Sequence, residues 1–333
     1  MIHSGRRCRP HSRTSTAPPV LTWSTDSLPA HERFAYWREE RGKQLFGVSI
    51  ELPPERRHLF HGRLSAQPIG GATLASLNAS AYEVSRTEAD IARVSTDSLM
   101  IGLQVAGPGW CDTPAGQTFI DAGTVAIGHA DLPSQGMPTT TGDFHIHMLT
   151  IPLGRIARGQ EAARRLYLAP VQQERHARLV DAALCALIED APGIAPDAAD
   201  AAITDIANLA LMTRGALTPG LPEVRQALRS AHRHAAIRIM RRNLHRGALP
   251  PETVADALGI SLRQLHLVFE PTGRSYHRTL SAIRVEMACR RLGTRPDQSI
   301  ADIAFACGFE SLATFYRAIR QLTGRTPGDF RGR

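Results

Sequence analysis

The amino-acid sequence predicts an α+β multidomain protein with a β-rich front half, a helical middle and an all-α C-terminal domain. Short runs of alternating apolar and polar residues lie between Gly, Pro and Asp turns in the front half, which is typical of an all-β barrel or sandwich. The following residues are rich in Ala and carry apolar side chains at helical spacing. The last hundred or so residues contain one helix–turn–helix pattern twice.

The chain of 333 residues is long enough for two or three domains with hydrophobic cores. Residues 215–222 contain two prolines and two glycines, which predicts a linker before the C-terminal domain. We expect a disordered tail at 1–20, a β-rich domain at 21–152, a helical dimerisation or linker segment at 153–215, and the C-terminal domain at 223–333.

Several segments of the front half carry clear signals. Phe34 and Trp37 lie in a short amphipathic stretch that predicts a helix. Strands are predicted around residues 63–66, 100–105 and 145–149, each flanked by turn residues.

Two helices are predicted between residues 153 and 215, with a break at 191–193. Their apolar stripe includes Leu179, Leu187 and Ile203. Such a stripe either packs within the chain or forms a dimer seam, and the sequence leaves both alternatives open.

The first helix–turn–helix pattern begins at Pro250-Pro251, a favourable helix start. Gly259 supplies the tight turn, and Ser261 is a plausible N-cap of the second helix. Leu265 and Phe269 lie four residues apart and share the face expected to pack inward.

The second pattern lies about fifty residues further on. Ser299 is expected to cap its first helix, and Gly308 forms the turn. Its second helix is predicted at about 311–322, with Phe309, Phe315, Ile319 and Leu322 on the buried side. A tandem pair of such units is a strong signal for entry of the second helices, about 261–270 and 311–322, into the major groove of DNA.

Charge supports this interpretation. The net charge is +8, but residues 224–333 contain 19 arginines against 8 acidic residues, a net charge of +11, and the remaining residues therefore sum to −3. A basic C-terminal third predicts a polyanionic partner for that domain alone.

The outward-facing residues of the two second helices are the candidate DNA contacts. Arg pairs bidentately with guanine, Gln pairs with adenine, and Ala or Thr meets the thymine methyl group. The candidates are Ser261, Arg263, Gln264, His266, Leu267, Ser311, Leu312, Ala313, Thr314, Arg317 and Arg320.

A helix from Ser275 to about Leu292 is predicted to connect the two units. About 18 residues at 1.5 Å each give about 27 Å, which suits two second helices about one DNA turn, roughly 34 Å, apart. Arg284 and Arg290 on this helix are candidates for phosphate contact.

These residues resemble the DNA-binding domain of the AraC/XylS family of transcriptional regulators. The resemblance covers about 235–330 and is strongest at 254–265, 299–309 and 324–331. It implies that base-reading positions fall on Arg263, His266 and Leu267 in the first unit and on Leu312, Ala313, Thr314 and Arg317 in the second. Leu267 stands where the family more often has Arg, and Ile319 where it usually has Phe.

Residues 22–38 and the front half are similar to family members in which a cupin-like β-barrel is joined by flanking helices to the DNA-binding domain. The resemblance implies a sensor that binds a small-molecule effector or mediates homodimerisation, in a regulator that activates or represses nearby promoters and acts with RNA polymerase.

His145 and His147 alternate on a predicted strand, so both side chains share one face. Cupin enzymes use such a pair for metal, but no Glu follows at the expected spacing, and His129 is the remaining nearby candidate. We therefore expect no metal, no cofactor and no catalytic residues. The alternative is a cupin-type metal-dependent enzyme fused to a DNA-binding domain.

Two further alternatives are a DNA-repair fusion and an architectural DNA-binding protein. The first needs a reactive Cys with zinc ligands nearby, and none of the five cysteines has that spacing. The second would bind DNA without sequence preference. No stretch approaches the roughly 20 apolar residues of a membrane span, and we expect a cytoplasmic protein without a membrane partner.

Overall fold

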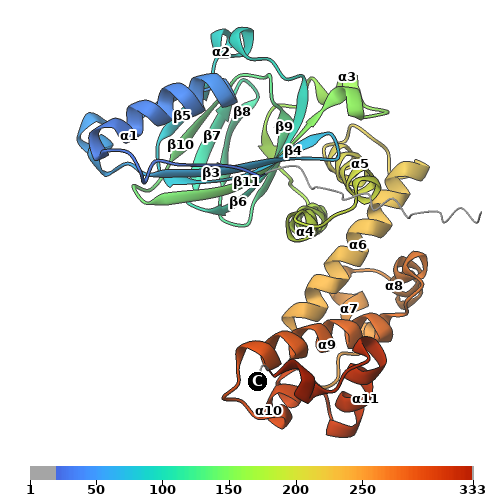
Figure 1. The fold of residues 1–333 in the computed structure, drawn as a ribbon. Coiled ribbons are helices and arrows are strands. Elements are labelled where there is room, and N and C mark those ends of the chain that lie inside the picture. Colours follow the sequence, from blue (N-terminus) through green and yellow to red (C-terminus); the bar gives the residue numbers. More distant parts are fainter. Residues whose placement is uncertain (1–19, 332–333) are drawn as a thin grey trace, which may run out of the picture.

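The computed structural model describes residues 20–331, and Figure 1 shows its arrangement. The expected disordered tail falls on residues 1–19, outside the described part, apart from Val20. The strands are β1 (Leu21–Ser24), β2 (Ser49–Glu51), β3 (Gly62–Ile69), β4 (Ala72–Ser80), β5 (Glu83–Arg86), β6 (Ser98–Ala106), β7 (Gly109–Thr113), β8 (Gly116–Ile120), β9 (Val125–His129), β10 (Ser134–Pro138), β11 (Asp143–Pro152) and β12 (Ala169–Pro170). The α-helices are α1 (Ala30–Tyr36), α2 (Glu88–Arg93), α3 (Gln160–Ala163), α4 (Glu174–Asp190), α5 (Pro196–Thr213), α6 (Pro222–Arg242), α7 (Pro251–Leu258), α8 (Leu262–Phe269), α9 (Tyr276–Thr294), α10 (Ile300–Ala306) and α11 (Leu312–Thr323).

The strands of the front half form two sheets, which confirms the expected α+β class. The seven-stranded sheet has the order β1-β3-β4-β11-β6-β9-β12, and the five-stranded sheet has the order β2-β5-β10-β7-β8. All the strand pairings in these two sheets are antiparallel, as expected for strands joined by short turns. Over residues 20–331 the hydrogen-bonded ladders therefore make two sheets rather than one closed barrel.

The seven-stranded sheet is covered on both faces, as its alternating side chains require. In β11, Leu149 and Ile151 belong to a core shared with α4 and α5, whereas Ile146 and Met148 pack on a second core. This second core lies among the seven-stranded sheet, β2, β5 and the first helix, and the predicted helix residues Phe34 and Trp37 are buried in it. Helix α1 continues as a π-helix, Trp37–Phe46.

Helices α4, α5 and α6 form a three-helix bundle against the seven-stranded sheet (Figure 1). The predicted break at 191–193 is confirmed, because α4 ends at Asp190 and α5 begins at Pro196. Leu179, Leu187 and Ile203 are all buried in the core that this bundle shares with the sheet. The apolar stripe thus packs within the chain.

Helix α6 joins the front half to the C-terminal domain without a break in the core. The core of the three-helix bundle continues along α6 into α7, α8 and α9 and includes Ala236, Val254 and Leu265. Residues 215–222 do connect α5 to α6, but Leu217 is only 8% exposed and packs in the same core. The second helix–turn–helix unit has a separate core, built around Phe309, Phe315 and Ile319.

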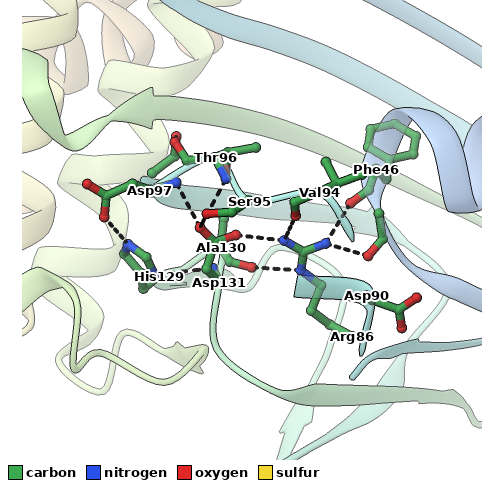
Figure 2. A network of polar contacts seen from close by, with 12 residues as sticks. Phe46, Arg86, Asp90, Val94, Ser95, Thr96, Asp97, His129, Ala130 and Asp131 are labelled. Atoms are coloured by element: carbon green, nitrogen blue, oxygen red, sulfur yellow. Dashed lines mark hydrogen bonds and ion pairs between the residues drawn. The ribbon is translucent and has the colours of Figure 1, made fainter. Parts of the chain in front are cut away.

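A buried polar network fixes the loops at one end of the five-stranded sheet (Figure 2). The Arg86 guanidinium donates to the Asp131 carboxylate at 2.6 Å and to the backbone carbonyls of Phe46, Gly47, Val94 and Ala130. Burial disfavours the charged carboxylate of Asp131, but hydrogen bonds from Ser95, the backbone and Arg86 outweigh burial and lower its pKa. The network thus satisfies a buried charge pair and holds three loop segments together.

No helix within residues 20–331 is long and apolar enough to cross a lipid bilayer.

Candidate nucleic-acid interface

The first helix–turn–helix unit consists of α7 and α8, as the sequence predicts. Gly259 ends α7 in the left-handed conformation, with φ +63°, which Gly adopts without steric cost. Ser261 is the N-cap of α8, and its hydroxyl accepts from the backbone N–H of Gln264 at 3.2 Å. Leu265 and Phe269 are buried against the core that contains Val254.

The outer face of α8 presents Arg263, His266 and Leu267, all of which are exposed. Gln264 is also exposed, but its side-chain oxygen accepts from the backbone N–H of Ser261 at 3.0 Å and completes a capping box. The cap occupies the amide oxygen that bidentate pairing with adenine requires. Gln264 thus has a structural role that its sequence position did not reveal.

The second unit consists of α10 and α11. Ser299 caps α10, and its hydroxyl accepts from the backbone N–H of Asp302 at 3.0 Å. Gly308 makes the turn with φ +79°, and Ser311 is the N-cap of α11. Phe315 and Ile319 are fully buried, but Leu322 is 47% exposed. The expectation that Leu322 is buried is therefore wrong, because the last turn of α11 extends past the small core of this unit.

The outer face of α11 presents Leu312, Ala313, Thr314, Arg317 and Arg320 at the surface. The Ser311 hydroxyl donates to the Thr314 hydroxyl at 3.0 Å, which orients the first turn of the helix. Arg317 and Arg320, like Arg263 on α8, form no ion pair with other residues in the part of the chain that the structure describes. Their guanidinium groups are thus available to a partner.

Helix α9 connects the two units and contacts both α8 and α11 (Figure 1). Its 19 residues give a length of about 28 Å at 1.5 Å per residue. Tyr276, at its start, is fully buried, and its hydroxyl donates to the Leu249 carbonyl at 3.0 Å. The connecting helix is therefore fixed to the first unit.

Arg284 has a different position from the one expected of a phosphate contact. Its guanidinium donates to the carbonyls of Arg246 and Gly247 at 2.8 and 2.9 Å, in the loop between α6 and α7. Burial lowers the pKa of Arg284. The backbone of Gly308 lies against the same loop, because a Cβ there would be 2.1 Å from the Leu244 carbonyl oxygen. Arg284 thus joins the two units, and we withdraw its assignment to phosphate.

Arg290 lies on the exposed part of α9 and pairs with Glu286 one turn earlier at 3.1 Å. Such an exposed pair is weak, so Arg290 is still able to meet a phosphate.

Sequence reasoning missed Arg175, at the start of α4. Its guanidinium carbon lies 3.7 Å from the position that a Cβ on Gly259 would occupy, at the turn of the first unit. Helix α4 therefore brings the Arg175 side chain close to the turn before α8. No local signal marks this contact, because it joins segments 84 residues apart in the chain.

The histidine pair of the front half does not lie in the core between the sheets. His145 and His147 share a face with Leu149 and Ile151, which pack on the helical bundle. His145 bonds the Ser76 hydroxyl at 3.0 Å, whereas His129 faces Asp97 at 3.2 Å. Within residues 20–331, no group of three or more His, Cys, Asp or Glu side chains is arranged to hold a metal ion.

Comparison with known proteins agrees with this geometry. A family model described as a helix-turn-helix domain matches residues 254–333. The transcriptional activator NphR of Rhodococcus sp is 25% identical over 333 residues, which is 96% of this chain and 95% of NphR. The HTH-type transcriptional activator RhaS of Enterobacter sp. (strain 638) is 37% identical over 81 residues, 24% of this chain and 29% of RhaS.

Among solved structures, the AraC-like transcriptional activator CuxR matches 86% of this chain and 100% of its own, with a TM-score of 0.50 and 21% identity. At that identity the likeness concerns the fold, and it extends over the sheets as well as the helical units. All three of these relatives are named as transcriptional activators. The chain is therefore a DNA-binding transcriptional regulator with a helix-turn-helix domain, and its fold is similar to that of an AraC-like activator.

Proposed function

We propose that the protein binds promoter DNA by placing α8 and α11 in two successive major grooves and that it activates transcription there in response to a small effector. The observation that carries the proposal is the pair of capped, exposed helix faces, each with an inward side buried in its own unit. The length of α9, about 28 Å, is compatible with two helices that follow one face of the duplex.

The proposal assigns a role to each outward side chain. Arg263, His266 and Arg317 read base edges, with Arg317 on a guanine. Arg320 and Arg290 contact phosphates, which gives affinity without sequence information.

Apolar and small side chains at the surface of both helices have a role in the same scheme. Leu267, Leu312, Ala313 and Thr314 are exposed on α8 and α11. The methyl group of thymine is the apolar feature of the major groove that such side chains contact. We assign to them the recognition of A·T base pairs.

A footprint on the promoter of the adjacent gene tests the assignment. Arg317→Ala should weaken binding by roughly 1–3 kcal/mol and relax the preference at one base pair. Arg320→Ala is the matched control, because loss of a phosphate contact weakens all sequences alike and reduces the salt slope by about 1. A footprint and a sequence preference unchanged by Arg317→Ala would contradict the assigned role.

Activation, rather than repression, is proposed because NphR and RhaS are named as transcriptional activators. Transcription in vitro with RNA polymerase should rise when the protein is added to a template that carries the footprinted site. A fall in transcript would assign repression instead.

We also propose a homodimer, as in many regulators with repeated half-sites. Since the stripes of α4 and α5 are buried within the chain, the dimer must use another face. Light scattering during gel filtration measures its mass, and a monomer at micromolar concentration with and without DNA would contradict the dimer.

A further inference from the structure

A cavity of about 140 Å³ lies between the seven-stranded sheet and the connection from α4 to α5. On the sheet side it is lined by Ser65, Ser76 and His147, among others. On the helical side it is lined by Ile188, Ala191 and Pro192. Figure 1 shows α4 and α5 against this side of the sheet.

Three polar side chains of the cavity form one row across three strands, and Gln67 on β3 is a fourth polar residue of the lining. Ser65 on β3 pairs with Ser76 on β4, and Ser76 pairs with His147 on β11. On one side of this row the same face carries the buried apolar residues Leu74 and Leu149, and on the other side it carries the polar residues Asn78 and His145. The row therefore lies at the border between the apolar, helix-covered part of this face and its polar part, where a ligand meets both kinds of surface.

The histidine of the row is held in position. The His145 ring stands edge-on to the His147 ring, with centroids 4.6 Å apart, and His145 is itself bonded to the Ser76 hydroxyl at 3.0 Å. Burial lowers the pKa of both histidines, and His145 lowers that of His147 further. A neutral imidazole offers one donor and one acceptor.

The lining specifies the chemistry of the ligand. None of the described residues that line the cavity carries a permanently charged side chain, so an ionic ligand would be buried without a counter-charge. The apolar wall of Ile188, Ala191 and Pro192 faces the polar row, which suits a flat molecule with one polar edge. A cavity of about 150 Å³ holds one benzene molecule, so the volume suits a single ring.

We propose that this cavity is the effector site and that it takes a neutral, single-ring compound with a hydrogen-bonding group on one edge. The assignment rests on the proposed response to an effector, but ligand binding is measured separately from DNA binding.

The surroundings of the cavity give it a route to the DNA-binding domain. Ile188 lies near the end of α4, and the adjacent Glu189 pairs with Arg241 on α6. A second pair, Asp181 with Arg238, joins the middle of α4 to α6. Since α6 shares its core with α7 and α8, a shift of α4 on ligand binding reaches the first helix–turn–helix unit.

Calorimetry on the full chain with benzamide tests the site, because benzamide combines a ring with a neutral amide. Benzamide should bind with one site per chain, and benzene and benzoate at least ten-fold more weakly. Ala191→Trp fills the cavity and His147→Phe removes the imidazole from its polar edge, so each should reduce the affinity for benzamide at least ten-fold. Ala201→Trp, at an exposed position on α5, should leave it unchanged.

Each outcome decides a separate point. Equal affinity of Ala191→Trp and Ala201→Trp for benzamide would mean that benzamide binds outside this cavity. Tighter binding of benzoate than of benzamide would overturn the proposal that the ligand is neutral. If the parent chain, shown by circular dichroism to be folded, does not bind benzamide saturably, the proposal that the cavity takes a neutral single-ring compound is wrong. If benzamide binds but changes the affinity for operator DNA by less than two-fold, the proposed route through α4 is wrong. If the parent chain gives no footprint at all, the proposed function fails while the binding result stands.

Discussion

Substitution of Gly308 by Ala is the sharpest test of how the two helix–turn–helix units are joined. Gly308 has φ +79°, and for a residue with a Cβ this left-handed conformation costs roughly 1–2 kcal/mol. A Cβ would also lie 2.1 Å from the Leu244 carbonyl oxygen and 2.9 Å from that of Arg246. Forcing an extra carbon into a packed site typically costs about 1–3 kcal/mol. Gly308→Ala should therefore destabilise the second unit by about 2–5 kcal/mol.

Gly324 provides the matched control. It ends α11 with φ +71°, and no heavy atom lies within 4 Å of the position that its Cβ would take. Gly324→Ala therefore has the conformational cost alone. The two variants should differ by about 1–3 kcal/mol, the contribution of the contact with the loop.

Hydrogen exchange of the amides in α10 and α11 is the suitable assay, because it reports the opening free energy of the second unit. The three tryptophans, Trp23, Trp37 and Trp110, all lie in the front half, so their fluorescence would report a different region. If Gly308→Ala and Gly324→Ala lower the opening free energy by the same amount within about 0.5 kcal/mol, the close approach to the loop has no energetic role.

Three further predictions follow from buried groups. Burial lowers the pKa of His234 to about 4, so the unfolded chain binds a proton at this residue first as the pH falls. Between pH 7.5 and 5 the free energy of unfolding, measured by urea unfolding followed by circular dichroism, should fall by up to about 2 kcal/mol more in the parent chain than in His234→Phe, and an equal fall in both would contradict the burial of this imidazole. Tyr276→Phe removes the hydroxyl that donates to the Leu249 carbonyl and should lower the opening free energy of α9, measured by hydrogen exchange, by about 1 kcal/mol. An unchanged opening free energy would mean that this hydrogen bond contributes nothing to stability. Arg284→Met should weaken operator binding without changing the dependence of the affinity on salt, because the Arg284 guanidinium is bonded to backbone carbonyls. A slope of log affinity against log salt concentration that is smaller by about 0.9 would instead support a phosphate contact by Arg284.

Local patterns in the sequence were sufficient for the elements of the C-terminal domain. Gly259, Ser261, Ser299 and Gly308 each occupy the turn or cap expected of them, because capping and left-handed turns depend on neighbouring residues alone. Leu322 was placed wrongly because helical periodicity shows which face a residue occupies but not how far the core extends.

Features that depend on tertiary contact could not be predicted. Strand periodicity put His145 and His147 on one face, but it could not say whether that face meets the opposite sheet or the helical bundle. Arg284 has the sequence context of a surface arginine on a DNA-binding helix, and only the fold brings the loop after α6 to its guanidinium. The two sheets likewise follow from long-range pairing that short alternating runs do not encode.

The uninterrupted core along α6 limits how this regulator can be recombined with others. Residues such as Val224, Ala227 and Ala231 of α6 are buried in the core that α6 shares with α4 and α5. A chimera joined at residue 222 would carry these apolar positions into a foreign host without the helices that cover them. The bundle also shares its core with the seven-stranded sheet, so a sensor is expected to be exchanged successfully only together with α4, α5 and the part of α6 that they cover.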